Sequence, residues 1–216
     1  HRVENLKLTI TYGVLVSTVR SAWPFGASYV VYQLYSRADF LMLYVLSGEA
    51  ATGVYASGYK FVDAGVMPLV FLGIAAYPRL SRSYQNDQDV FVRTGSRLLR
   101  MCVMGGFLLA WALFFVVPGL VVPVFGEQFT ETVSVVRLLA ALGPLLGINA
   151  AMIRLLLAAD LQIKRVKLQA WATGLNIALN AILIPFFGVF GAVGASIVAL
   201  LVMDVLYYGG VKECID

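Results

Sequence analysis

Charged side chains are scarce in this 216-residue chain, since Asp, Glu, Lys and Arg make up 13% of it and 60% is hydrophobic. A soluble domain is about half apolar and about one quarter charged. The mean hydropathy of +0.84 is therefore that of a chain whose main solvent is lipid. The net charge of +4 then reflects attraction to anionic lipid headgroups and not nucleic acid binding.

The residues that most enzymes and metal sites need are nearly absent. The chain has one histidine, His1, which excludes a Ser/His/Asp triad and a histidine-rich metal site. Its two cysteines, Cys102 and Cys214, form no C-x-x-C motif and lie near the predicted cytoplasmic face, where thiols stay reduced. No phosphate-binding loop of the G-x-x-x-x-G-K type occurs. We therefore expect no enzymatic activity, no metal and no cofactor.

Basic residues are missing from every second connection between the apolar segments. The connections 47–49, 119–132 and 186–188 contain none. Twelve of the sixteen basic residues lie in the other connections and at the two ends: Arg2, Lys7, Arg20, Arg79, Arg82, Arg93, Arg97, Arg100, Lys164, Arg165, Lys167 and Lys212. This alternation is the positive-inside pattern of a multi-pass inner-membrane protein. It predicts six spans with both termini in the cytoplasm.

The apolar segments predict an all-α polytopic membrane protein. A span needs about 20 apolar residues to cross about 30 Å of hydrocarbon. The uncharged run 168–203 is too long for one span, so the sequence Pro-Phe-Phe-Gly at 185–188 must break it. We expect residues 1–20 to be a cytoplasmic or interfacial linker and residues 21–216 to form a six-helix transmembrane lobe, with an amphipathic helix at 85–100. The expected spans are 21–46, 50–77, 101–117, 133–159, 168–184 and 189–208.

Ionisable residues inside the first two spans are candidates for function, because a charge in the bilayer is costly. The loop between these spans is centred near Gly48, which puts Arg37 and Lys60 at almost the same depth, Asp39 slightly nearer the outside and Asp63 slightly deeper. We expect these four side chains to form a charge cluster about halfway across the membrane, with Asp39 and Lys60 as partners. The cluster either lines a path for an anionic substrate or neutralises itself and fixes helix register.

Three further charges lie nearer the ends of spans. Arg137 and Arg154 are each a few residues from an end of the fourth span, where their side chains can extend to a lipid headgroup. Asp204 lies close to the inner interface, and we expect it to be solvated there.

The last two spans contain signals for helix packing. Asn176 and Asn180 share one face of the fifth span and can hydrogen-bond to a neighbouring helix or face a wet cavity. Gly191, Ala195 and Ala199 repeat every four residues in the sixth span, and small residues at that spacing allow close helix approach.

Several segments together resemble a known transporter family. Five segments resemble the seventh and eighth helices of polysaccharide flippases: Pro24-Phe25, Tyr35-Ser-Arg-Ala-Asp39, Leu43, the run from Gly48 to Lys60, and Tyr77-Pro-Arg-Leu-Ser81. Gly126-Glu-Gln-Phe129 resembles the outer loop before the tenth helix. The pattern that resembles the eleventh and twelfth helices is Asn176-x3-Asn180-x3-Ile184-Pro185-x2-Gly188-x2-Gly191-Ala192. The family is that of Wzx-type O-antigen or exopolysaccharide flippases, in the multidrug/oligosaccharidyl-lipid/polysaccharide exporter superfamily.

This resemblance implies that the chain is the C-terminal lobe of a two-lobe transporter whose substrate cavity lies between six-helix lobes. The implied function is export, by flipping across the inner membrane, of a polyprenyl-diphosphate-linked oligosaccharide for surface polysaccharide biosynthesis. The implied partners are this lipid-linked oligosaccharide, membrane lipids, the N-terminal lobe and polysaccharide assembly proteins. Because the substrate carries phosphate, Arg37, Lys60 and Arg137 would be its cationic contacts, with Asp39 and Asp63 completing the site.

Other functions stay open. A drug or cation antiporter of the same superfamily would use a proton- or sodium-titratable carboxylate, here Asp39 or Asp63. A membrane glycosyltransferase or ligase usually needs a large outer loop with acidic or histidine residues, which this chain lacks. The third possibility is a membrane assembly subunit that transports nothing.

Overall fold

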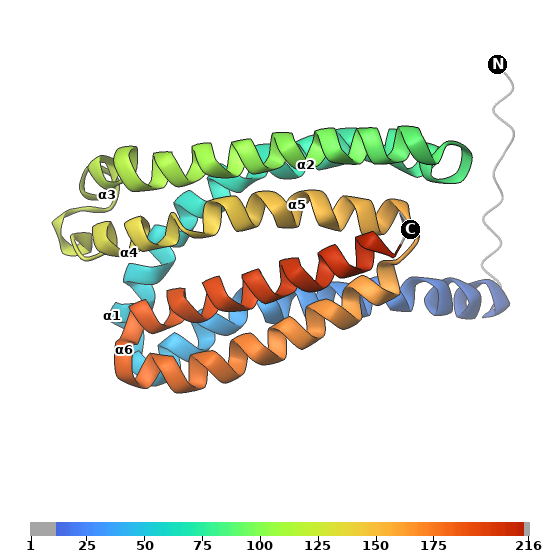
Figure 1. Cartoon of the computed structure of the whole chain (residues 1–216). Helices are drawn as coiled ribbons and strands as arrows, with labels where there is room; N and C mark the ends of the chain where they lie inside the picture. The colour runs from blue at the N-terminus through green and yellow to red at the C-terminus, as the bar shows by residue number, and fades with distance from the viewer. Residues whose placement is uncertain (1–11, 214–216) are drawn as a thin grey trace, which may run out of the picture.

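The computed structural model describes residues 12–213, which are almost entirely helical (Figure 1). The helices are α1 (Tyr12–Asn86), α2 (Gln88–Trp111), α3 (Pro118–Phe125), α4 (Thr132–Leu139), α5 (Leu142–Ala158) and α6 (Gln162–Lys212). A π-helical turn, Ala112–Val116, joins α2 to α3, and a 3-10 turn, Glu127–Phe129, precedes α4. The predicted all-α class is confirmed for this part of the chain.

The two longest helices, α1 and α6, each reverse direction at a glycine. Gly48 has φ 85° and Gly188 has φ 54°, a region that residues with a Cβ rarely adopt. Phe40 packs on Tyr55 across the first reversal, with ring centroids 5.1 Å apart. Each long helix is therefore a hairpin of two antiparallel arms.

The three left-handed glycines mark the three turns at one end of the bundle, the left end in Figure 1. The third is Gly126, which follows α3 with φ 93°. We call this the glycine end; it coincides with the three connections that lack basic residues. The opposite end holds the α1–α2 and α5–α6 junctions and the end of α6 (Figure 1), and we call it the basic end.

Two arms each from α1 and α6, the run α2–α3 and the run α4–α5 make six helical passes between these ends. Within residues 12–213, three helical segments are long and apolar enough to cross a membrane: Arg37–Asn86, Gln88–Val116 and Gln162–Lys212. The pair α4 and α5, bent by 46°, makes a fourth candidate if it counts as one span. The number of passes agrees with the six predicted spans, and that all six cross a membrane stays a prediction.

The helices extend beyond the predicted spans at the basic end. Residues 1–11 of the predicted linker lie outside the described part of the chain, but 12–20 already belong to α1. α1 also continues to Asn86 and α2 begins at Gln88, with Asp87 as the N-cap that accepts a hydrogen bond from the Val90 backbone N–H (3.0 Å). Hydropathy locates where lipid contact ends, whereas a cap locates where the helix ends. The predicted helix at 85–100 is thus part of α2.

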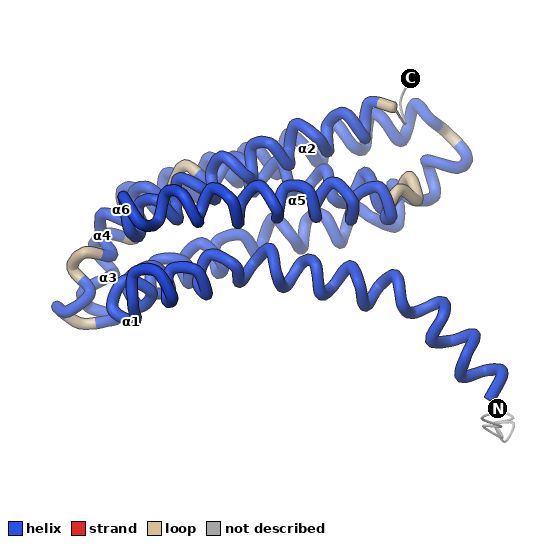
Figure 2. The backbone as a smooth tube through the Cα atoms, turned by 90° about the horizontal axis from the view of Figure 1, so that it is seen from below, coloured by secondary structure: helices blue, strands red, loops and turns tan. Residues whose placement is uncertain are grey.

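The described surface of the bundle is apolar and part of its interior is polar. Trp171 and Phe186 are 78% and 79% exposed, as expected for side chains that face lipid. The buried polar side chains include Asp39, Asn180 and Asp204. Figure 2 shows that the beginning of α1 diverges from the other helices, so the interior is enclosed by the remainder.

Candidate functional site

A buried carboxylate, Asp39, lies where the α1 hairpin packs against the α6 hairpin, and it is 7% exposed. Asn180 donates from Nδ2 to its Oδ1 (2.6 Å). The hydroxyls of Ser196 and Tyr55 donate to its Oδ2 (2.5 and 3.2 Å). Asn180 also donates to Oδ1 of Asn176 (3.0 Å). We call these five residues the Asp39 cluster.

Helical periodicity and close packing bring the cluster together. Asn176 and Asn180 are four residues apart in the first arm of α6, so both face the same way. The second arm approaches closely because Gly191, Ala195 and Ala199 are small; a Cβ built on Gly191 would lie 2.4 Å from the Leu183 carbonyl oxygen. The expectation that this stripe packs and that the asparagines join helices agrees with the geometry.

The partners of Asp39 are all neutral. Among the described residues the one salt bridge joins Lys164 to Glu213 at the basic end, so no Lys or Arg compensates Asp39. A buried carboxylate without a counter-charge is costly and is stabilised by a bound proton or cation. The oxygen-rich surroundings fit either, since Oδ1 of Asn180 is buried without a partner. Within 12–213 no group of three or more His, Cys, Asp or Glu could hold a metal ion. A monovalent cation or a proton therefore suits the cluster better than a divalent metal ion.

A cavity of about 190 Å³ opens beside the cluster, between α1, α5 and α6. Asp39, Asn176 and Ser196 contribute to its polar lining, together with Asp63 and Asn149. At about 30 Å³ per water, this volume holds a few water molecules and not an oligosaccharide. The lobe interior can therefore serve a small ion, whereas a large substrate needs a surface of the lobe.

The three basic residues of the predicted site lie on the outside of the lobe. Arg37 is exposed, with its guanidinium 5.9 Å from the ring centroid of Phe40 and within electrostatic range of the exposed Asp63. Lys60 is exposed, with Nζ 5.5 Å from the ring centroid of Phe125. Arg137 is exposed on α4. None of these three basic side chains has an ion pair within the described part of the chain.

The structure joins the predicted four-residue charge cluster only in part. Asp39 and Asp63 line one cavity, and Arg37 lies within electrostatic range of Asp63, whereas Lys60 has no ion pair in the described part of the chain. Tyr55, not Lys60, faces Asp39 across the reversal at Gly48. At about 100° per residue, Lys60 points about 140° away from Tyr55, and Arg37 about 160° away from Asp39. Equal depth along the membrane normal stays a prediction, and it does not lead to pairing because the residues occupy different helix faces. The prediction that Asp39 and Lys60 are partners is wrong in this structure.

Sequence reasoning missed parts of the interior. Ser196 and Tyr55 were not singled out as ligands of Asp39, since neither carries a charge and tyrosines are frequent in α1. Asp204 is not solvated as predicted: it is 5% exposed, and Asn149 donates to its Oδ1 (2.9 Å). One signal in the sequence could have indicated this burial. Asn149 lies in an apolar segment, and a buried asparagine side chain needs a hydrogen-bond partner.

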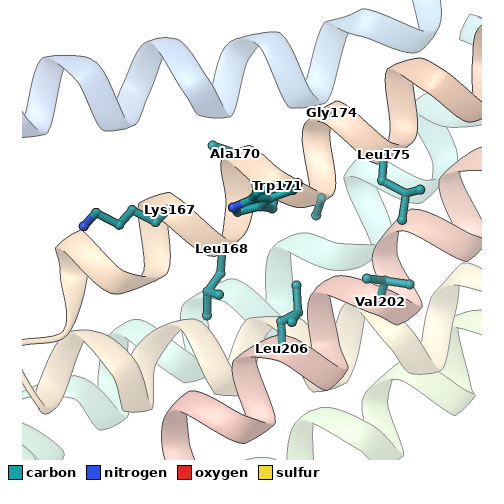
Figure 3. Close-up of a pocket in the computed structure, with 9 residues that line it drawn as sticks. Lys167, Leu168, Ala170, Trp171, Gly174, Leu175, Val202 and Leu206 are labelled. Atoms are coloured by element: carbon teal, nitrogen blue, oxygen red, sulfur yellow. The ribbon is translucent and has the colours of Figure 1, made fainter.

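A second, larger cavity has a different chemistry. A groove of about 980 Å³ lies between the two arms of α6, with Trp171, Leu175, Val202 and Leu206 among its lining residues (Figure 3). Lys167 at one edge is its one charged side chain. Such a surface suits lipid acyl chains and offers few groups to a sugar.

Comparison with models of known protein families and with curated proteins finds no match. Among solved structures, the fold is similar to an outward-facing conformation of a multidrug resistance MATE family transporter of the MOP superfamily, with a TM-score of 0.82 and 12% sequence identity. The match covers 96% of this chain and 48% of that transporter, so the chain spans about half of its length. Identity this low shows the fold alone. The chain has the fold of about half of that transporter. That this is the C-terminal half, and that the chain belongs to the polysaccharide flippases, stay predictions.

Proposed function

We propose that this chain is one lobe of an exporter that flips a polyprenyl-diphosphate-linked oligosaccharide across the membrane for surface polysaccharide biosynthesis. The observation that carries the proposal is the exposure of Arg37 and Lys60 inside the predicted spans without an ion pair in the described part of the chain. A diphosphate that enters low-dielectric surroundings needs cations in place of its hydration shell. The fold and the ordered motifs of the polysaccharide flippases support the same function.

The division between inside and outside of the lobe supports a role for each part. The interior cavity is too small for the substrate, which therefore binds on the outer surface against the partner lobe. The Asp39 cluster holds the coupling proton or monovalent cation. Rocking of one lobe against the other around a central site would give alternating access.

The test is export by variants of the membrane-inserted protein in a strain that lacks its own flippase. Arg37→Ala and Lys60→Ala should each lower surface polysaccharide when normalised to membrane-inserted protein. Arg37→Lys should keep only part of the activity. The lysine keeps the positive charge, but it lacks the planar fork that binds two phosphate oxygens. Arg100→Ala is the control, since Arg100 is exposed on α2 near the basic end. Normal export by both alanine variants would contradict the proposal.

The second candidate is a cation-coupled drug antiporter, which is favoured by the likeness in fold to a multidrug resistance transporter and by the buried Asp39. Drug susceptibility of cells that express the protein separates the two functions. Asp39→Asn should abolish transport in either case, because the amide keeps the shape of the side chain and cannot hold a cation's charge. Drug resistance that depends on Asp39 but not on Arg37 and Lys60 would favour the antiporter.

A further inference from the structure

A second buried carboxylate, Asp204, lies in the second arm of α6, toward the basic end. Its Oδ1 accepts a hydrogen bond from Asn149 of α5, and its Oδ2 is buried without a partner. Neither Asp204 nor Asn149 is more than 8% exposed. An ionised oxygen left in this way is costly, so it needs a proton, a water molecule or an ion.

Two other buried polar atoms near the same end lack partners, Oε1 of Gln169 and Nε of Arg165, and the hydroxyl of Tyr207 lies at the Arg165 guanidinium. Tyr207 is three residues from Asp204 and therefore shares its helix face. The α6 hairpin places Gly191 against Leu183 and Gly210 against Leu168, and this register brings Gln169 to the level of Tyr207.

Water suits the atoms that stay without a partner, which are Oδ2 of Asp204, Oε1 of Gln169 and Nε of Arg165. They combine donors and acceptors, and buried water typically makes about three hydrogen bonds to such groups. The Tyr207 hydroxyl lies within hydrogen-bonding range of Arg165 and within electrostatic range of Asp204. Arg154 of α5 in turn lies within range of Arg165 and of Tyr77 of α1. The one hydrogen bond to Asp204 comes from the neutral Asn149, so Oδ2 of Asp204 can take a proton.

Asn149 connects this region with the Asp39 cluster. Its side chain bonds Asp204 and also lines the cavity of about 190 Å³ that Asp39, Asn176 and Ser196 share. The cavity wall is mostly apolar, but these polar side chains give water molecules hydrogen-bond partners inside it. Polar groups thus extend from the basic end, through Asp204 and Asn149, to Asp39.

We propose that Asp204 is a proton-binding site that relays protons through water between the medium at the basic end and Asp39, inside the lobe and apart from the substrate. A proton moves from water to Oδ2 of Asp204, then through cavity water to Asp39, and Asp204 returns to the carboxylate that accepts the next one. This inference rests on the proposed function only in that Asp39 holds the coupling ion.

The experiment is infrared spectroscopy of the purified protein, which resolves protonated carboxyl groups and their hydrogen–deuterium exchange. Asp204→Asn and Asp39→Asn should each remove one protonated carboxyl band on acid titration. Asp204→Asn should also slow exchange at the Asp39 band by about tenfold or more, as expected when one step of the relay is lost. Glu213→Gln is the control, because Glu213 is an acid at the same end that is exposed and paired with Lys164, and it should change neither rate.

Asn149→Leu provides a test that keeps both carboxyl groups. It should leave both bands in place and slow exchange at Asp39, because the leucine closes the polar connection. Unchanged exchange at Asp39 in Asp204→Asn and in Asn149→Leu would overturn the relay, as would an Asp39 that never protonates. The export test uses Arg37 and Lys60, and the relay test uses hydrogen–deuterium exchange at Asp39. Failure of the proposed export function would therefore not change the exchange result, and the two proposals can fail separately.

Discussion

At the scale of single residues, the charge on Asp39 determines what the lobe interior can do. A carboxylate in a membrane interior costs about 2.5–3.5 kcal/mol even by permissive insertion scales. Hydrogen bonds from Asn180, Ser196 and Tyr55 offset part of this cost without cancelling the charge. The site is thus stable enough to persist and remains dependent on a bound proton or cation, which is what a coupling site requires.

Ser196 should contribute measurably to stability. Ser196→Ala removes a hydroxyl that donates to Asp39 Oδ2 at 2.5 Å, and it should lower the free energy of unfolding by about 1–3 kcal/mol. Thermal unfolding in detergent measures the change. Ser134→Ala is the matched control, since Ser134 is exposed on α4 and should shift the midpoint little. Equal midpoints for both variants would show that the hydroxyl does not support Asp39.

The sequence locates the residues of this site only in part, for a physical reason. Asp39 and the pair Asn176 and Asn180 stand out because ionisable and amide groups are rare in apolar segments. Ser196 and Tyr55 do not, since hydroxyls are common and cheap to bury. Their role depends on the rotation of one helix against another, which the sequence of either helix does not contain.

At the scale of helices, α2 and α5 meet backbone to backbone through glycines. A Cβ built on Gly106 would lie 2.5 Å from the Gly143 carbonyl oxygen, and one on Gly147 would lie 2.3 Å from the Cys102 carbonyl oxygen. Gly143 and Gly147 form a G-x-x-x-G motif, whose spacing puts both on one face. In lipid, where burial of apolar surface drives no association, such close packing stabilises the helix pair.

Gly147→Ala should therefore destabilise the bundle, although alanine favours helices. The methyl group would overlap the α2 backbone, which cannot rotate away as a side chain can, so we expect a loss of about 1–3 kcal/mol. Gly174→Ala is the control, because no atom lies within 4 Å of its Cβ position and α6 should gain from alanine. Membrane-inserted protein and thermal midpoint are the readouts. A Gly147→Ala variant as stable as Gly174→Ala would show that the α2–α5 contact can open without cost.

Turns were predictable from the sequence where helix ends were not. The three connections without basic residues contain Gly48, Gly126 and Gly188, and all three adopt the left-handed conformation that glycine permits. Pro185 was expected to help break the helix at the third turn, but it stays inside α6 and Gly188 makes the reversal. Helix ends at the basic end depend on polar caps such as Asp87. Hydropathy averaged along the chain does not detect such caps.

At the scale of the whole molecule, the lobe has two chemically different ends. One has three glycine turns and no basic residue in its connections, and the other gathers most of the Arg and Lys residues. The asymmetry fits the positive-inside rule, by which basic loops stay in the cytoplasm. The fold class and the number of passes could be predicted because both follow from hydropathy and charge, which act along the chain and need no knowledge of helix contacts.

The asymmetry also predicts the orientation of the protein in the membrane. The basic end, with both termini and the segment 79–100, should face the cytoplasm, and Gly126–Phe129 should face outward, because basic loops stay in the cytoplasm and this turn has no basic residue. Cells converted to spheroplasts and treated with a membrane-impermeant thiol reagent test this in a background that lacks Cys102 and Cys214. Glu127→Cys, exposed in the 3-10 turn after Gly126, should react at once. Asp89→Cys, exposed at the start of α2, is the matched position at the other end and should react only after permeabilisation. The reverse pattern would invert the lobe and would place the opening of the proposed proton relay outside the cell.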